Sequence, residues 1–215
     1  KKNTIGAILI KKKKLSETKN KIKKKRFNFL RSEFISVLLK TIKKNDLIIS
    51  TTGYTSRELY QIRKESQNNL GKDFYMVGGM GHAISTSLGI ASNTNQRIIC
   101  LDGDGSLLMH LGSLNLVNYL KPKNLKHIIF NNNAHESVGG QDTYFDLIDL
   151  KKLSKSFGYN NFNILNSKKN LKKEINKFLK KKGPSFLEVK IDNGSLKKLS
   201  RPKSLKSIKE NFINY

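Results

Sequence analysis

The chain has 215 residues, and 42 lysines and arginines against 16 aspartates and glutamates give it a formal net charge of +26. Its 15 glycines and 3 prolines exclude collagen-like and proline-rich chains, and its single cysteine excludes a disulfide framework and a cysteine-based zinc cluster. The sequence has no apolar run of about 18 residues, the length that crosses a membrane, and we expect no signal peptide. We therefore expect no membrane partner and a reducing compartment, the cytoplasm.

The basic charge indicates either a polyanionic partner or a drift in composition. Of the 42 basic residues, 36 are lysine and 6 are arginine, and the lysines form short runs at 11–14, 23–25 and 180–182. Nucleic-acid sites typically use arginine forks and stacking aromatic rings, and the chain has no tryptophan. A nucleic-acid partner is therefore not favoured, although a non-enzymatic basic nucleic-acid-binding protein stays as an alternative. The positive field would favour a small anionic substrate.

The first third of the chain predicts a strand, a linker and a helix. Residues 5–10 are apolar and predict a short buried strand, and the lysine-rich stretch up to residue 26 predicts a linker. Apolar residues recur at helical spacing over 27–44, which predicts an amphipathic helix. The next apolar run, 47–50, predicts a strand, and Ser56 is expected to cap a helix over 57–64.

From residue 47 onward, strands and helices are expected to alternate. The remaining strands are predicted at 74–77, 97–101, 126–130, 163–165 and 185–191. The remaining helices are predicted to end at Ala91 and at Leu120 and to span 147–157 and 171–179. This alternation favours an α/β fold with three layers, a parallel sheet with helices on both faces, over residues 27–195. Residues 196–215 are basic and predict a frayed or docked helical tail.

Four loops of unusual composition follow predicted strands, at 51–55, 78–81, 102–106 and 131–141. They are rich in glycine, asparagine, aspartate and threonine. In parallel sheets the ligand binds at the carboxyl ends of the strands, so one composite site explains the four loops better than four unrelated turns.

The loop Asp102-Gly103-Asp104-Gly105-Ser106 combines glycines with a carboxylate. Glycines let the backbone approach a phosphate closely, but Asp104 would repel that phosphate unless a divalent cation lay between them. A dinucleotide-binding motif is excluded because Leu108 stands where its third glycine would be, and a Walker loop is excluded because Gly-Lys-Ser/Thr is missing.

A second polar loop, Asn131-Asn132-Asn133, is expected beside the first. Asn132 lies 28 residues after Asp104, an interval that accommodates one helix and one strand. Asp104, an asparagine side-chain oxygen and a loop carbonyl could then face one octahedral Mg²⁺ that also binds two phosphate oxygens.

Gly-Asp-Gly followed by Asn-Asn at this spacing resembles the diphosphate- and magnesium-binding motif of thiamine diphosphate enzymes. Within that class, residues 51–59, 102–114 and 131–141 are similar to the phosphonopyruvate decarboxylase family, and the similarity extends over 28–192. The resemblance implies thiamine diphosphate- and Mg²⁺-dependent, non-oxidative decarboxylation of 3-phosphonopyruvate to phosphonoacetaldehyde and CO₂, a step of phosphonate biosynthesis. Sulfopyruvate decarboxylase and acetolactate synthase relatives are the alternatives, and His135 with Gly139-Gly140-Gln141 favours phosphonopyruvate.

The same resemblance assigns roles to individual residues. It implies that Asp104, Asn132 and the carbonyl of Ala134 bind the metal. This chain departs from the family at Asn131-Asn132-Asn133, where the family often has Asp-Asn-Gly, but the ligand Asn132 stays in place. Gly78 would accept a hydrogen bond from the aminopyrimidine, and Met80 would wedge the cofactor into its bent form. The residues implied for the diphosphate are Thr52, Gly53, Tyr54, Thr55, Gly103, Gly105 and Ser106.

The four histidines carry different expectations. His135 is a candidate proton shuttle or contact for the substrate carboxylate or phosphonate, and alternatively it only braces its loop. His82, His110 and His127 are expected to be structural.

The resemblance also implies a missing half. Enzymes of this class pair a diphosphate-binding domain with a pyrimidine-binding domain, and residues 1–12 resemble the end of the latter, followed by a lysine-rich linker at 13–26. We expect the chain to be a diphosphate-binding part that is inactive without that domain and belongs to a homo-oligomer.

Overall fold

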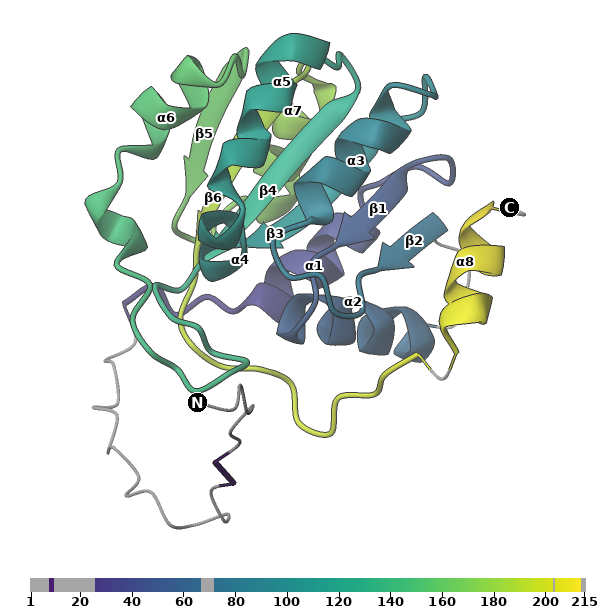
Figure 1. Cartoon of the computed structure of the whole chain (residues 1–215), viewed down its shortest axis with the longest axis vertical. Coiled ribbons are helices and arrows are strands. Elements are labelled where there is room, and N and C mark those ends of the chain that lie inside the picture. Colours follow the sequence, from purple (N-terminus) through teal and green to yellow (C-terminus); the bar gives the residue numbers. More distant parts are fainter. Residues whose placement is uncertain (1–7, 10–25, 67–71, 203, 214–215) are drawn as a thin grey trace, which may run out of the picture.

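The computed structural model describes residues 8–9, 26–66, 72–202 and 204–213. It contains one six-stranded sheet in which all neighbouring strands are parallel, in the order β2-β1-β3-β4-β6-β5 (Figure 1). The strands are β1 (Leu47–Ser50), β2 (Lys72–Tyr75), β3 (Ile98–Gly103), β4 (Leu125–Asn131), β5 (Asn161–Leu165) and β6 (Ser185–Lys190). The α/β fold with a parallel sheet is thus confirmed.

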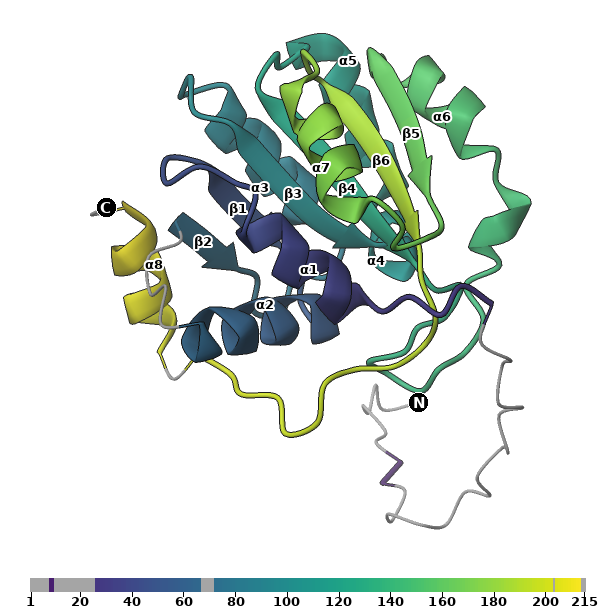
Figure 2. The ribbon, with the colours of Figure 1, turned by 180° about the vertical axis from the view of Figure 1, so that it is seen from behind.

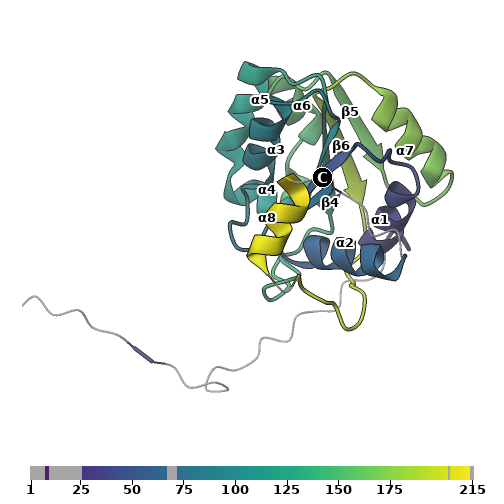
Figure 3. The same ribbon diagram turned by 90° about the vertical axis from the view of Figure 1, so that its right-hand side faces the viewer.

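Helices cover both faces of the sheet, as the side view in Figure 3 shows. One face carries α1 (Arg31–Leu39), α2 (Tyr54–Glu65) and α7 (Leu171–Lys180), which Figure 2 shows in front of the strands. The other face carries α3 (Ala83–Ala91), α4 (Asp104–Met109), α5 (Asn115–Leu120) and α6 (Leu150–Ser156). Short 3₁₀ turns at Leu111–Leu114 and Phe145–Leu147 precede α5 and α6.

Two hydrophobic clusters, one on each face, hold the three layers together. On the α1 face, Phe34 contacts Phe130 of β4 edge to face with ring centroids 5.4 Å apart. On the α3 face, Leu88 and Leu107 pack with Cys100 and Phe186 of the sheet. The central strands β1 and β4 are buried along their whole length, and most of their residues are apolar, which is typical of parallel sheets. Strand β4 also buries Lys126 and His127.

Three of the predicted helices have different bounds. The helix expected over 27–44 shrinks to α1, because the amides of Arg26 and Phe27 bind the Asp192 carboxylate at 2.7 and 3.0 Å. These bonds hold residues 26–28 in a bend in which Asn28 adopts φ 46°, so the helix begins only at Arg31. At the other end, the Asp46 carboxylate accepts the Lys43 amide.

Ser56 was expected to cap the helix after β1, and this is wrong. The helix begins at Tyr54, because Gly53 adopts φ 98°, a conformation that favours glycine, and forms the N-cap. Ser56 lies inside α2 and donates a 2.7 Å hydrogen bond to the Thr51 carbonyl.

The helix expected to end at Leu120 is broken in two by a 3₁₀ turn. The break occurs at His110, whose φ of −141° is not helical, and Gly112 follows with a low helix propensity.

The basic tail contributes α8 (Leu205–Ile213), which packs beside the edge strand β2 through a contact of Phe212 with Phe74. The strand expected at 5–10 and the linker at 13–26 lie outside the described residues, except for residues 8–9 and 26. Among the described residues, every helix is too short or too polar to cross a bilayer.

Candidate functional site

The loops that follow β1, β3 and β4 line one cavity at the carboxyl edge of the sheet. Sheet register brings them together, since Ser50 of β1 pairs with Leu101 of β3, and Gly103 of β3 pairs with Phe130 of β4. The chain passes from β1 outward to β2 and then back across to β3, so the cavity lies where the connection direction reverses. Every residue predicted for the site lines this cavity, except Gly53 and Gly78.

The loop after β1 is tied to the loop after β3. The Thr51 and Ser106 hydroxyls share a 2.7 Å hydrogen bond, and the same Ser106 oxygen accepts the Gly81 amide at 3.0 Å. Ser106 therefore joins three of the four expected loops. Gly53 is next to the residues that line the cavity, and a Cβ added at Gly53 would lie 3.0 Å from the Ser137 hydroxyl oxygen.

Asp104 is the buried acid of the cavity, with 3 % of its surface exposed. The Thr143 hydroxyl donates a 2.7 Å hydrogen bond to its Oδ2. Burial raises the pKa of Asp104 to about 6, and the hydrogen bond from Thr143 is the largest of the effects that oppose this shift. A carboxylate that has lost water without gaining a full positive partner is a suitable ligand for a cation.

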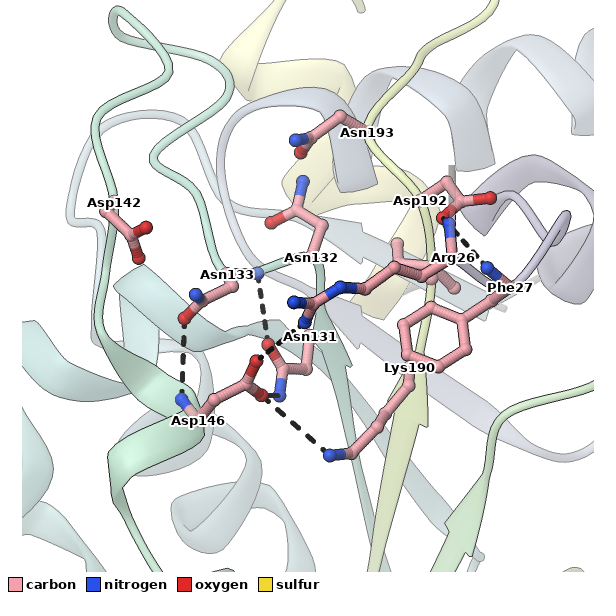
Figure 4. Close-up of a pocket in the computed structure, with 11 residues that line it drawn as sticks. Arg26, Phe27, Asn131, Asn132, Asn133, Asp142, Asp146, Lys190, Asp192 and Asn193 are labelled. Atoms are coloured by element: carbon pink, nitrogen blue, oxygen red, sulfur yellow. Dashed lines mark hydrogen bonds and ion pairs between the residues drawn. The ribbon is translucent and has the colours of Figure 1, made fainter. Parts of the chain in front are cut away.

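The three consecutive asparagines point in different directions. The Asn131 side chain donates to Glu188 at 2.7 Å and to Asp146 at 3.2 Å. Figure 4 shows the bond to Asp146. Asn133 accepts the Phe145 amide at 2.8 Å. Only Asn132 of the three lines the cavity that contains Asp104.

Asn132 also borders a second hollow on the far side of its loop, drawn in Figure 4. The charged residues that line it are Arg26, Lys190, Asp142, Asp146 and Asp192. The loop after β4 therefore borders both cavities, through Asn132.

His135 stands over Gly105. A Cβ at position 105 would lie 2.6 Å from His135 Cε1, so the ring can occupy its place only because the residue is glycine. The loop that carries His135 is closed by its main chain: its amide donates to the Gln141 carbonyl at 2.8 Å, and its carbonyl accepts from Val138 and Gly140. The imidazole packs on Gly105, and His135 lines the cavity.

Met80 and Gly78 occupy different positions relative to the cavity. Met80 lines it, and its terminal methyl group lies 3.9 Å from the Cβ position of Gly53. Gly78 is exposed and lies outside the lining. Gly81 is pressed against α4, where a Cβ would meet the Ser106 carbonyl at 3.1 Å.

His127 and Asp102 support the strand end beneath the cavity. Both are fully buried, and His127 Nδ1 shares a 2.6 Å hydrogen bond with the Tyr159 hydroxyl. Asp102 accepts the Gly103 amide at 2.9 Å, and its other oxygen lies 3.7 Å from His127 Nε2.

Burial raises the pKa of the neighbouring Cys100 thiol well above its usual value, so this cysteine stays protonated and is no nucleophile.

Sequence reasoning missed a buried ionic group beside the cavity. Arg31 Nε donates to Glu58 Oε2 at 2.8 Å, and Arg31 Nη2 lies 3.4 Å from Glu136 Oε2. Glu58 pairs with Arg31 and not with its sequence neighbour Arg57, which lies over the Tyr54 ring. The partners are 27 and 105 residues apart in sequence, and no local pattern in the chain indicates them.

The donor set of the cavity fits a hard divalent cation. Asp104, Asn132 and the backbone at Ala134 offer oxygen ligands, which Mg²⁺ prefers, and they share the cavity with the hydroxyls of Thr52 and Ser106. Gly105 leaves its amide unobstructed by a side chain of its own, as close approach of a phosphate requires. The arrangement can hold an anion through a bridging metal ion.

Comparison with known proteins agrees with this chemistry. The family described as thiamine pyrophosphate enzyme, C-terminal TPP binding domain, matches residues 51–189. The matched segment begins at the loop after β1 and ends in β6, so it includes all the loops of the cavity.

Three relatives of known activity are similar over most of the chain. Phosphonopyruvate decarboxylase of Streptomyces viridochromogenes is 39% identical over 166 residues, 77% of this chain and 41% of that protein. Phosphonopyruvate decarboxylase of Streptomyces hygroscopicus is 41% identical over 73% of this chain and 38% of its own length. Sulfopyruvate decarboxylase subunit beta of Methanothermobacter thermautotrophicus is 38% identical over 70% of this chain and 76% of that subunit. The chain thus spans about two fifths of the first two relatives.

Proposed function

Because the chain belongs to the thiamine pyrophosphate enzymes through their C-terminal TPP binding domain, we propose that it is the diphosphate-binding part of a Mg²⁺-dependent decarboxylase. The proposed reaction is the non-oxidative decarboxylation of 3-phosphonopyruvate to phosphonoacetaldehyde and CO₂, in phosphonate biosynthesis. Thiamine diphosphate, when bound, supplies the electron sink for loss of CO₂. We place this enzyme in the cytoplasm.

One observation carries the proposal: Asp104 and Asn132 line the same cavity, although 28 residues separate them. In the proposed complex, Asp104, the Asn132 side-chain oxygen and the Ala134 carbonyl hold Mg²⁺. Gly103, Gly105 and Ser106 bind the diphosphate from one side. The loop of Thr52, Gly53, Tyr54 and Thr55 binds it from the other.

Two residues are proposed to place the remainder of the cofactor. Met80, which reaches toward Gly53, would wedge beneath its centre and keep it bent. The exposed carbonyl of Gly78 would accept a hydrogen bond from the aminopyrimidine. Both residues precede α3, so the backbone of one loop would set both contacts.

His135 is the proposed acid–base residue. Its loop is closed by main-chain hydrogen bonds, which leave the ring available for the reaction. The ring would transfer a proton to or from the bound substrate, or contact its carboxylate or phosphonate.

Sulfopyruvate is the second candidate substrate, because a sulfopyruvate decarboxylase subunit beta is 38% identical to the chain and a phosphonopyruvate decarboxylase is 39% identical. Phosphonate and sulfonate differ by charge and one protonation site, so both are anions that the net charge of +26 would attract.

A pyrimidine-binding domain, from another chain or from another part of the same protein, is the proposed partner, and the assembly would be a homo-oligomer of such units. The cavity opens to the surface at the apolar side chain of Val138, which is 63% exposed.

The metal and cofactor site is tested by Asp104→Ala. We expect loss of Mg²⁺-dependent thiamine diphosphate binding, measured by isothermal titration calorimetry, with an unchanged circular dichroism spectrum. The control is Asp149→Asn, which replaces an exposed acid and keeps the cap of α6. Normal cofactor binding by Asp104→Ala would overturn the proposal.

The substrate is tested by product analysis in the assembled enzyme. Release of phosphonoacetaldehyde from 3-phosphonopyruvate, faster than release of sulfoacetaldehyde from sulfopyruvate, supports the first candidate, and the reverse order supports the second. Consumption of neither acid, together with DNA binding that weakens steeply with salt, would support the nucleic-acid alternative.

A further inference from the structure

We propose that Glu136 is a positioning residue that sets the orientation of the Asn132 side chain, so that its oxygen and not its NH₂ group is available to the metal. This inference rests on the proposed metal site and names a residue that the proposed function does not use. Glu136 lines the cavity four residues after Asn132.

The hydrogen bond between the two side chains defines the orientation. Glu136 Oε2 accepts a 3.1 Å hydrogen bond from Asn132 Nδ2. An ionised carboxylate only accepts, so it selects the NH₂ end of the amide. The oxygen end of Asn132 then faces the other way, where it accepts the Ala134 amide at 3.2 Å.

Arg31 and Gly194 hold Glu136 in this position. Arg31 Nη2 lies 3.4 Å from the oxygen that binds Asn132, and the Gly194 amide donates to the other carboxylate oxygen. Arg31 is itself fixed by the 2.8 Å bond of its Nε to Glu58, whose side chain is fully buried. The Glu136 carboxylate is therefore held from α1 and from the segment after β6.

A rotated Asn132 amide would lose both of its functions. Its oxygen would face the Glu136 carboxylate, which repels it, and its NH₂ group would face the cation, to which it cannot bind. Residues that orient a metal ligand in this way typically change metal affinity by about 10- to 100-fold when they are removed.

The test compares Glu136→Ala in two backgrounds. In the native background, we expect the affinity for Mn²⁺, measured by electron paramagnetic resonance with thiamine diphosphate present, to fall about 10-fold. In the Asn132→Asp background, the same change should leave affinity unchanged or raise it. A carboxylate at 132 has two equivalent oxygens and needs no orientation, and removal of Glu136 relieves a repulsion between like charges.

A merely structural role gives a different result. If Glu136 only stabilised the loop, its removal would weaken Mn²⁺ binding equally in both backgrounds, and that outcome overturns the proposal. Glu136→Gln, which can still accept from Asn132, should stay within about threefold of the native affinity. Should Glu136→Ala not fold, Glu136→Met keeps the length of the side chain, and its Mn²⁺ affinity is measured in both backgrounds.

Asp104→Ala separates this inference from the proposed function. If Asp104→Ala still binds Mn²⁺ with thiamine diphosphate, the metal site itself is wrong. If Asp104→Ala abolishes binding while Glu136→Ala behaves alike in both backgrounds, the metal site stands and only the orienting role of Glu136 fails. The chain is used as it is isolated, together with any subunit that copurifies with it.

Discussion

The imidazole of His135 occupies the space that a side chain at Gly105 would need, with Cε1 of the ring 2.6 Å from the Cβ position. The two residues come from loops after neighbouring strands, β3 and β4. Their contact means that neither residue can be changed without effect on the other.

Gly105→Ala should therefore push the His135 ring aside and destabilise the chain, and the added methyl group beside the proposed diphosphate site should weaken thiamine diphosphate binding by more than about 10-fold. Titration calorimetry measures the affinity, and urea unfolding measures the stability. His135→Ala combined with Gly105→Ala should restore the stability that Gly105→Ala loses, because the clash is with the ring.

The matched control is Gly89→Ala in α3, where a Cβ meets nothing within 4 Å. That change should stabilise the chain by about 0.5–1 kcal/mol. Full cofactor affinity in Gly105→Ala would contradict the placement of the diphosphate.

His135→Ala alone should lower kcat of the assembled enzyme by about 100-fold, the range of a lost acid–base group. The affinity for thiamine diphosphate should change little, because main-chain bonds close the loop. Steady-state kinetics and calorimetry measure the two quantities. A fall in affinity at unchanged kcat would show that His135 only braces the loop.

Arg31→Met should destabilise the chain by about 3–5 kcal/mol, because it leaves Glu58 buried without its ionic partner. Arg31→Met combined with Glu58→Leu should be more stable than Arg31→Met alone, since no buried charge is left unpaired at this position. Urea unfolding measures both. The exposed Arg26, 3.8 Å from Asp146, provides the control, and Arg26→Met should change the unfolding free energy by less than about 1 kcal/mol. Equal effects of the two arginine substitutions would contradict this ranking.

Lys126 should make the stability of the chain depend on pH above neutrality. It is 2 % exposed, and burial, with repulsion from Arg97 and Lys181, lowers its pKa from 10.5 to about 8. The unfolded chain then binds more protons than the folded chain between these values, so this group makes the unfolding free energy rise as pH increases from 8 to 10.5. The full rise is about 3 kcal/mol.

The measurement for Lys126 is urea unfolding at several pH values, in the native chain and in Lys126→Met. The unfolding free energy of the native chain minus that of Lys126→Met should increase as pH rises from 8 to 10.5. Other lysines titrate in both proteins and cancel. A difference that is independent of pH would show that Lys126 is solvated in the folded chain.

The placement of Asp104 and Asn132 in one cavity could be predicted from the sequence because it follows from topology. Apolar runs separated by helical segments imply parallel strands, and parallel strands end at the same edge of a sheet. Residues that directly follow two neighbouring strands are then close, whatever the intervening helix contains. This reasoning held although the helix between β3 and β4 is broken at His110.

The ionic group of Arg31, Glu58 and Glu136 could not be predicted in the same way. It depends on how α1 and α2 pack and on where the loop after β4 folds back. Tertiary packing sets both arrangements, and no periodic pattern in the sequence indicates them. The start of α2 was mistaken for a related reason. A serine was read as the cap, whereas the left-handed backbone of Gly53 made the cap possible three residues earlier.

The docking of α8 on β2 has a consequence for synthesis of the chain. Among the described strands, β2 is an outer strand of the sheet, and outer strands can recruit strands from other molecules. The helix that packs beside it, Leu205–Ile213, follows every strand of the sheet in the sequence. During translation this edge therefore stays open until that helix has left the ribosome, and in that interval a nascent chain is most prone to pair with its neighbours.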